Sequence, residues 1–194
     1  NTKGLVDAIG KRRFITRLES AMELSAKVNF NALGDNFSRY PINHGNQPNM
    51  QSCYLFNHAG APWLTQKWSR AIQESYYGMG PRDAYPGDED QGQMSAWFVM
   101  SAIGLFQMDG GASENPHYEL GSPRFKKITI HLSDRYHDGN TFVIEAPNAS
   151  SKNKYIHSMI LNGQELNTWR FPQNELIRGG KLFIEMKSFP KKSK

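Results

Sequence analysis

An acidic loop runs directly into an apolar helix at residues 87–97, whose sequence is Gly87-Asp88-Glu89-Asp90-Gln91-Gly92-Gln93-Met94-Ser95-Ala96-Trp97. Three carboxylates this close repel one another, and a fold tends to keep such a cluster where a metal ion, a proton or a hydroxyl-rich ligand shares the site. A simpler interpretation is a capping box, in which Asp90 accepts backbone N–H bonds and Gln93 reaches back. Acidic helix caps are common, so the local pattern leaves both interpretations open.

The helix that follows, residues 94–106, is apolar nearly all the way round. A helix of this kind is buried on every side. This predicts a helix from the inner ring of a double-layered helical barrel, in which inner N-termini aim loops such as residues 87–92 at one central pit. Trp97 lies two turns after Asp90, and its position predicts either a core residue or a side chain that lines the pit.

Helical periodicity also covers much of the chain before the acidic loop. Apolar residues recur at three- and four-residue steps over residues 5 to about 27, where Gly10 separates a short helix from a longer one. The pattern resumes at Met50 and stops at Gly60, and Pro62 marks the start of the next helix. The sequence therefore predicts four helices here, the last two joined by a short connection.

Residues 29–49 lose this periodicity and are predicted to form loops, including turns at 34–37 and 40–49. The second loop and the residues after it offer imidazole and amide groups, which suit a hydroxyl-rich or calcium-type ligand. These side chains are His44, Asn46, Gln47, Asn49 and Gln51. Loops rich in Asn also form ordinary turns, and His44 could equally be a hydrogen-bonded structural histidine.

The hydrophobic pattern changes to a period of two after Gly104. Alternation at 128–132, 142–144, 159–161 and 182–186 predicts strands, and Asn162-Gly163 predicts a hairpin turn. The sequence therefore predicts an α+β fold, in which a small antiparallel β layer packs on the helical part.

Composition excludes several classes of protein. The 194 residues are 38% hydrophobic and 12% aromatic, which is typical of a folded globular protein. We expect no membrane span, because the chain lacks an apolar run of about 18 residues. Cys53 is the only cysteine, which excludes an internal disulfide and a cysteine-based zinc cluster. The start of the chain has neither an initiator Met nor a signal-peptide core, which predicts a trimmed or internal segment.

The formal net charge of +5 comes from scattered groups rather than from a basic stripe interleaved with aromatic residues. We therefore expect no nucleic-acid partner. The six histidines contain no pair four residues apart, and the chain has no G-x-S-x-G motif and no dinucleotide-binding loop. Paired carboxylates remain as the candidate chemistry.

A helix N-terminus favours an ionised carboxylate, so Asp88 or Asp90 would suit a general base better than a general acid. That assignment predicts a second, proton-donating carboxyl group elsewhere, at about 6.5–9.5 Å in an inverting glycosidase. None of the acidic residues on the predicted helices and turns has an apolar setting that would raise its pKa. We therefore expect the acid to be missing from this sequence.

Four ordered motifs resemble the C-terminal part of glycoside hydrolase family 92, which consists of calcium-dependent, inverting exo-α-mannosidases. They are HGNQP at 44–48, YLFNHAGAPW at 54–63, PGDEDQGQMSAW at 86–97 and GSPRF at 121–125. The segment 153–163 is also similar to the end of the family, so the resemblance covers essentially the whole chain.

The resemblance implies an (α/α)6 barrel, preceded in full-length members by a β-sandwich domain, with the active site between them. Residues 1–123 would supply the later part of the barrel with the acidic loop, and residues 124–194 a terminal β layer and basic tail. Asp88 and Asp90 match the acidic pair that activates the water, and Asp90 is the first choice as base. The proton-donating Glu of the family would lie upstream.

The predicted site combines substrate and metal ligands. Calcium is the expected cofactor, with Asn46, Gln47 and Asp90 as its predicted ligands, and His44, Asn46 and Trp97 are the predicted substrate-binding residues. The family usually has Glu where Gln47 stands, and a neutral amide would weaken a charged calcium or sugar site.

The expected function is that of a C-terminal segment of a secreted or periplasmic bacterial α-mannosidase acting on mannose-containing glycans. The segment alone would be inactive, and its exposed barrel faces would associate with the upstream part of the enzyme or with a second copy. An alternative from another class is a non-catalytic carbohydrate-binding or scaffold module, which Gln47 and the missing acid favour. A nucleic-acid-binding protein has only the net charge in its favour.

Overall fold

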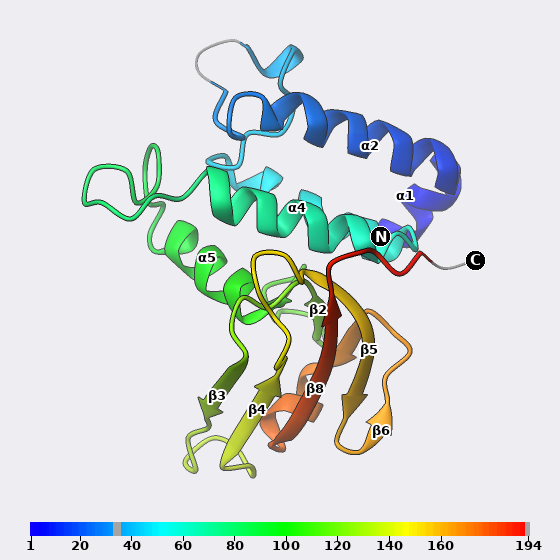
Figure 1. Ribbon diagram of the computed structural model, residues 1–194, viewed down its shortest axis with the longest axis vertical. Helices are drawn as coiled ribbons and strands as arrows, with labels where there is room; N and C mark the ends of the chain where they lie inside the picture. The colour runs from blue at the N-terminus through cyan, green and yellow to red at the C-terminus, as the bar shows by residue number, and fades with distance from the viewer. Residues whose placement is uncertain (33–35, 193–194) are drawn as a thin grey trace. The chain divides into compact units, whose positions relative to one another are not determined.

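The computed structural model describes residues 1–32 and 36–192 (Figure 1). The predicted turn at 34–37 therefore falls partly outside the described residues. The chain divides into two compact units, which we call unit 1 (residues 1–101) and unit 2 (residues 102–192). None of the helices in the described ranges combines the length and the apolar character that a membrane span needs.

Unit 1 is helical. Its elements are α1 (Thr2–Ile9), α2 (Lys11–Ala26), η1 (Asn36–Ser38), η2 (Gln47–Asn49), η3 (Ser52–Tyr54), α3 (Leu55–His58), α4 (Pro62–Ser75) and α5 (Gln93–Ile103), whose last residues belong to unit 2. The predicted break between α1 and α2 is confirmed at Gly10, and Gly60 ends α3 in a left-handed conformation with φ 70°. Pro62 opens α4, as predicted.

The long helices α2 and α4 lie side by side within unit 1 (Figure 1). Helix α4 buries Leu64, Trp68 and Ile72 at every fourth residue on one face, and its C-cap residue Tyr76 continues this buried row. The Trp68 ring meets Phe30 edge to face, with 6.2 Å between ring centroids. This row places Tyr76 at the C-terminal end of a fixed core helix.

Helix α5 differs from the prediction in two ways. It ends at Ile103 rather than at residue 106, because Gly104 takes a left-handed φ of 93° and the chain then enters a strand. It is also buried on one side only, since Val99 is 54% exposed while Trp97 is 3% exposed. One apolar side of α5 therefore lacks cover from the part of the chain that the structure describes.

Unit 2 contains the strands. They are β1 (Leu105–Phe106), β2 (His117–Leu120), β3 (Lys127–His131), β4 (Thr141–Glu145), β5 (Tyr155–Leu161), β6 (Gln164–Glu165), β7 (Arg170–Pro172) and β8 (Gly180–Lys187), with a short helix α6 (Gln173–Ile177) before β8. One sheet has the order β1-β2-β7. The other has the order β3-β4-β8-β5-β6, which can be followed in Figure 1. The stacked rings of Phe142 and Phe171, 6.0 Å apart, join the two sheets.

The predicted α+β fold is confirmed, with helices first and a largely antiparallel β region after them. The β4–β8 pair is parallel, and β5, β6, β7 and α6 form the long connection that a parallel pair requires. The predicted hairpin is present, with Asn162 and Gly163 both at positive φ between β5 and β6.

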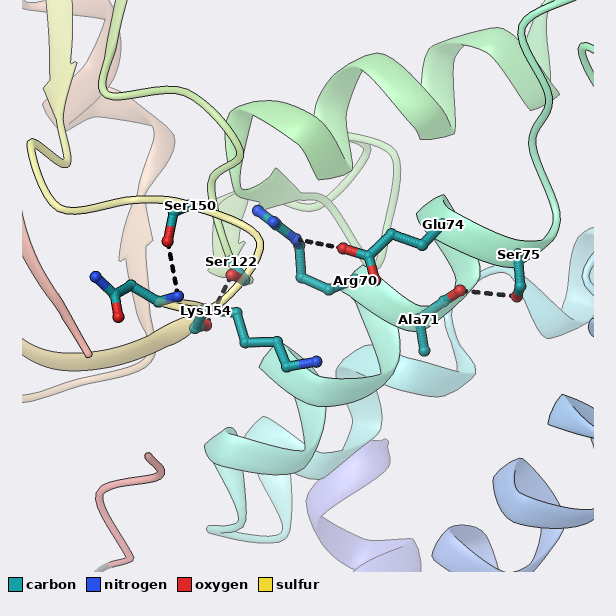
Figure 2. A network of polar contacts seen from close by, with 8 residues as sticks. Arg70, Ala71, Glu74, Ser75, Ser122, Ser150 and Lys154 are labelled. Carbon is teal, nitrogen blue, oxygen red and sulfur yellow. Dashed lines mark hydrogen bonds and ion pairs between the residues drawn. The ribbon is translucent and has the colours of Figure 1, made fainter. Parts of the chain in front are cut away.

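Two strands precede the boundary predicted at 123/124. Strands β1 and β2 are two and four residues long, too short to show a period of two in the sequence. Between β2 and β3, the buried Ser122 donates a hydrogen bond to the Lys154 carbonyl at 2.7 Å (Figure 2). The residues around Ser122 thus form part of the β unit.

Candidate active site

The loop that carries the predicted polar ligands is fixed through its main chain. The His44 N–H donates to the Phe30 carbonyl at 2.8 Å, and the Ile42 N–H donates to the Ser25 hydroxyl at 2.9 Å. The Asn49 N–H donates to the Asn46 carbonyl at 2.8 Å, which turns the chain into η2. The first part of this loop is therefore held by Ser25 in α2 and by Phe30 shortly after it.

His44 is fully buried within an aromatic cluster. Its ring centroid lies 4.2 Å from that of Trp97, 4.9 Å from that of Tyr76 and 5.5 Å from that of Tyr77. Burial lowers the pKa of His44 to about 3, so the imidazole is neutral at physiological pH.

The hydrogen bonds assign the tautomer of His44. Burial raises the pKa of Tyr77, so its hydroxyl keeps its single proton, which it donates to the Met94 carbonyl at 3.1 Å. The Tyr77 oxygen must then accept the bond of 2.8 Å from His44 Nε2–H. His44 Nδ1 carries the lone pair and finds no hydrogen-bond partner among the residues that the structure describes.

These contacts give structural roles to two predicted substrate-binding residues, His44 and Trp97. His44 has the hydrogen-bonded structural role that the sequence also allowed. Trp97 is a core residue, because its Nε1–H donates to the Met50 carbonyl at 2.9 Å and its ring lies parallel to that of Tyr77, 5.9 Å away. Direct contact of either side chain with a sugar stays a prediction.

Tyr76 contacts both the loop at residues 40–49, which we call the polar loop, and the residue just before the acidic loop at 87–92. Its hydroxyl donates to the Pro86 carbonyl at 2.7 Å and also lies where a Cβ on Gly45 would sit. Burial and the nearby charge of Asp90 raise the pKa of Tyr76 to about 12. The structure therefore gathers the segment beside Asn46 and the segment that carries Asp90 around one buried phenol oxygen.

The acidic loop has an unusual backbone. Asp90 and Gln91 adopt left-handed conformations with φ of 57° and 61°, and Gly92 follows with φ of 89°. Asp tolerates this region better than most side chains, but such residues store strain and persist only where their surroundings hold them. Asp88 is exposed, whereas Asp90 is half-buried.

Glu89, rather than Asp90, caps helix α5 through its side chain. Its carboxylate accepts a hydrogen bond from the Ser95 N–H at 2.8 Å, and hydrogen bonds from Ser95 hold the pKa of Glu89 below its usual range. Asp90 contributes its main-chain carbonyl, which accepts from the Gln93 N–H at 3.3 Å. The capping box predicted for Asp90 and Gln93 is thus replaced by a Glu89 cap, because the left-handed turn moves the cap one residue earlier.

The donor atoms available for a cation are oxygen atoms. The described residues contain no group of three or more His, Cys, Asp or Glu side chains that could hold a metal ion. The predicted ligands are two amides, Asn46 and Gln47, and one carboxylate, Asp90. Their segments meet around the Tyr76 hydroxyl, and a set of hard oxygen donors of this kind fits calcium rather than zinc.

A proton-donating carboxyl group is a separate requirement. Among the described residues, Glu119 is the single buried acid, and it lies on β2 in unit 2, opposite Arg170. The described residues of unit 1 therefore include no carboxyl group held in an apolar setting.

Sequence reasoning missed the tyrosines and the role of Glu89. Tyr76 follows Ile72 at four residues, so the pattern identified it as one more core position of α4. Its hydrogen bond to the Pro86 carbonyl depends on the path of residues 77–86 back toward the end of α4. The sequence contains no local signal for that path.

Comparisons with known proteins identify the family. Residues 1–188 match the model of the glycosyl hydrolase family 92 catalytic domain. The α-mannosidase BT3965 from Bacteroides thetaiotaomicron is 29% identical, with a TM-score of 0.83, over 100% of this chain and 24% of that chain. The inverting mannosidase BT2199 from the same bacterium is 34% identical, with a TM-score of 0.77, over 98% of this chain and 26% of that chain.

A fungal protein described as an uncharacterized secreted glycosidase, from Arthroderma benhamiae, is 28% identical over 144 residues, which are 73% of this chain and 18% of that protein. The chain thus spans about a quarter or less of the length of these relatives. Because the family model covers nearly the whole chain, the chain belongs to glycosyl hydrolase family 92.

Proposed function

We propose that this chain is the C-terminal segment of a longer, secreted or periplasmic, calcium-dependent α-mannosidase that releases terminal mannose with inversion. The observation that carries the proposal is the meeting of the polar loop and the acidic loop at the Tyr76 hydroxyl, in a chain that belongs to this family. Two structural relatives support the substrate class, since one is an inverting mannosidase and another has been solved in complex with mannoimidazole.

Asp90 is the proposed general base. Its ionised carboxylate accepts a proton from water while the water oxygen forms a bond to the anomeric carbon and the bond to the leaving oxygen breaks. Asp90 suits this role better than Asp88 because it is half-buried and its backbone is held in a strained conformation. Asp88 would be the second member of the acidic pair. The proton for the leaving oxygen would come from an acid in the rest of the longer protein.

Asn46, Gln47 and Asp90 would hold the calcium ion, each through a side-chain oxygen. When bound, the ion would hold mannose hydroxyls and favour a distorted sugar ring. Gln47 is neutral, so the site in this chain has one charge fewer than the Glu-containing motif that is usual in the family. The buried His44 and Trp97 would help to position the polar loop and would not contact the ion.

Unit 1 would form the later helices of an (α/α)6 barrel. Its uncovered apolar surfaces support this assignment. A shallow, mainly apolar groove runs along α2, and Val99 leaves a side of α5 open. The groove residues include Ile9, Phe14, Leu18, Leu24 and Pro41. Earlier helices of the same enzyme are the proposed cover.

Hydrolysis of an aryl α-mannoside by the full-length protein tests the proposal. We expect turnover with calcium, loss of turnover with a chelator, and release of β-mannose as the first product by NMR. Asp90→Asn should lower kcat by at least about 100-fold, because a missing general base costs roughly 10²–10⁴-fold. This chain alone should be inactive.

A full-length protein that binds mannose but hydrolyses no α-mannoside would contradict the proposal. It would favour the alternative of a carbohydrate-binding module, for which Gln47 is the motivating residue. Retention of the anomeric configuration would instead contradict the assignment of Asp90 as the base for an attacking water.

A further inference from the structure

We infer that Tyr76 is a positioning residue for the reaction, and that its hydroxyl fixes the acidic loop so that Asp90 faces the segment at Asn46. This inference rests on the proposed function, since it gives Tyr76 a task only if Asp90 acts on a substrate. Tyr76 itself is 3% exposed and would not touch the sugar.

The first support is the bond between Tyr76 and the acidic loop. The phenol O–H donates to the Pro86 carbonyl at 2.7 Å, and this main-chain group comes directly before Gly87, which has a positive φ of 83°. At the other end, the Glu89 carboxylate holds the Ser95 N–H at 2.8 Å. The strained Asp90 therefore lies between two side-chain anchors, and Tyr76 supplies one of them.

The second support is the contact between Tyr76 and the polar loop. A Cβ added to Gly45 would collide with the Tyr76 hydroxyl oxygen, yet it would lie 3.5 Å from the ring carbon Cζ, which is an ordinary contact. The hydroxyl thus occupies the space that a side chain at residue 45 would fill. The same oxygen atom therefore sets the position of the residue before Asn46 and of the residue four before Asp90.

The ring of Tyr76 has little freedom to move. It meets the His44 ring edge to face at 4.9 Å and the Tyr77 ring at 5.2 Å between centroids. His44 is in turn held by Tyr77 through the bond at its Nε2. A fixed ring gives the hydroxyl a fixed direction, which a flexible donor could not provide.

The test uses Tyr76→Phe in the full-length protein, which removes the hydroxyl and leaves the ring. We expect kcat on an aryl α-mannoside to fall by about 10- to 100-fold with KM changed less than about twofold, because a small misplacement of a reacting group can cost roughly 10²-fold. In an Asp90→Asn background the same substitution should cause no further loss. The control Tyr155→Phe, in β5, should leave both constants unchanged.

A second double-mutant cycle tests whether the Tyr76 hydroxyl oxygen also positions the polar loop at Gly45. Gly45→Ala should lower kcat in the protein with Tyr76, where the new Cβ displaces the hydroxyl. In the Tyr76→Phe background the same change should have little further effect, because the collision partner is gone. If Tyr76→Phe does not fold, Gly45→Ala takes its place in the cycle with Asp90→Asn. Gly45→Ala is suitable because it retains every hydroxyl group.

Hydrogen exchange separates this inference from the proposed function. In the folded protein, peptides that cover residues 86–94 should exchange faster in Tyr76→Phe than in the wild type or in Tyr155→Phe. If the wild type hydrolyses no α-mannoside, the proposed function fails, and unchanged exchange at 86–94 would overturn the positioning role as well. If the wild type is active, a kcat within twofold of wild type, or losses that multiply with Asp90→Asn, would overturn it.

Discussion

Gln47 stands in the polar loop at a position where a carboxylate would add charge to the proposed calcium site. It is half-buried at the start of η2, one residue after Asn46. Calcium sites gain affinity with the number of charged ligands. A change of Gln47 to Glu therefore tests whether this side chain binds calcium or only forms part of the turn.

Replacement of Gln47 by Glu is expected to tighten calcium binding by about tenfold, which corresponds to roughly 1.4 kcal/mol. Titration calorimetry of the full-length protein with calcium measures the change. Gln164→Glu adds the same charge at an exposed position of β6, outside the polar loop, and serves as the matched control. Equal tightening by both variants would show a general effect of charge and contradict a ligand at residue 47.

The residue scale also shows what the sequence could predict of the site. The sequence alone predicted the candidate chemistry, namely the polar loop, the three acidic residues and their order along the chain. The burial of His44 was not, because it depends on Trp97 and Tyr77, which reach it from segments more than 30 residues away. Glu89 was missed as the cap because the left-handed conformation of Asp90 has no signature in the hydrophobic pattern.

Among the elements, the end of helix α5 depends on a single glycine. Gly104 has a φ of 93°, and a Cβ there would lie 2.9 Å from the ring and backbone nitrogen of Pro123. The N–H of Gly121 also donates to the Gly104 carbonyl at 2.9 Å. The helix can therefore pass into β1 only with the backbone freedom and the small size of glycine.

Replacement of Gly104 by Ala is expected to destabilise the protein by at least about 2 kcal/mol, since strain at positive φ adds to a collision. The matched control is Gly163→Ala at the β5–β6 hairpin. It has a similar φ of 84° but open space around the new Cβ, so it should cost less. Urea unfolding of both variants measures the difference, and equal costs would show that the contact with Pro123 is unimportant.

The outer face of the five-stranded sheet carries an ion pair that predicts a dependence on pH. Lys181 on β8 lies 2.5 Å from Glu145 on β4, and its hydrogen bond is the main reason that the pKa of Glu145 is below its usual range. A depressed carboxyl pKa contributes stability above the ordinary value of 4.5, and that stability is lost as pH falls through the lower folded value.

Replacement of Lys181 by Met is therefore expected to lower the free energy of unfolding at pH 7 and to lower it less at pH 3. Urea unfolding at the two pH values measures this difference. The pair is partly exposed, so the effect should be small and should decrease with salt. Lys152→Met, at an exposed loop position, provides the control, and the same pH dependence in both variants would contradict the assignment.

The elements show which parts of a fold a single sequence reveals. Helices α1, α2 and α4 and the hairpin at Asn162 have local signals, namely apolar periodicity, Gly and Pro punctuation, and a turn dipeptide. The strands β1 and β2 and the parallel β4–β8 pair do not, because pairing between distant segments leaves no local pattern.

For the whole molecule, the uncovered apolar surfaces are expected to make the isolated chain associate. Leu24 in the groove along α2 is 40% exposed. Leu24→Lys should therefore reduce self-association in sedimentation experiments. Met79→Lys is the control, since Met79 is fully exposed on a loop outside the groove and should change nothing. A monomeric wild-type chain with no exposed hydrophobic surface by dye binding would contradict this prediction.

Strand β8 comes last among the strands of this chain but lies in the middle of the five-stranded sheet, between β4 and β5. During translation, the hairpins β3–β4 and β5–β6 leave the ribosome tunnel before the strand that joins them. Until residues 180–187 emerge, each hairpin presents an unpaired edge to other nascent chains and to chaperones. A stop codon only a few residues before β8 would thus remove the centre of the sheet and not merely its margin.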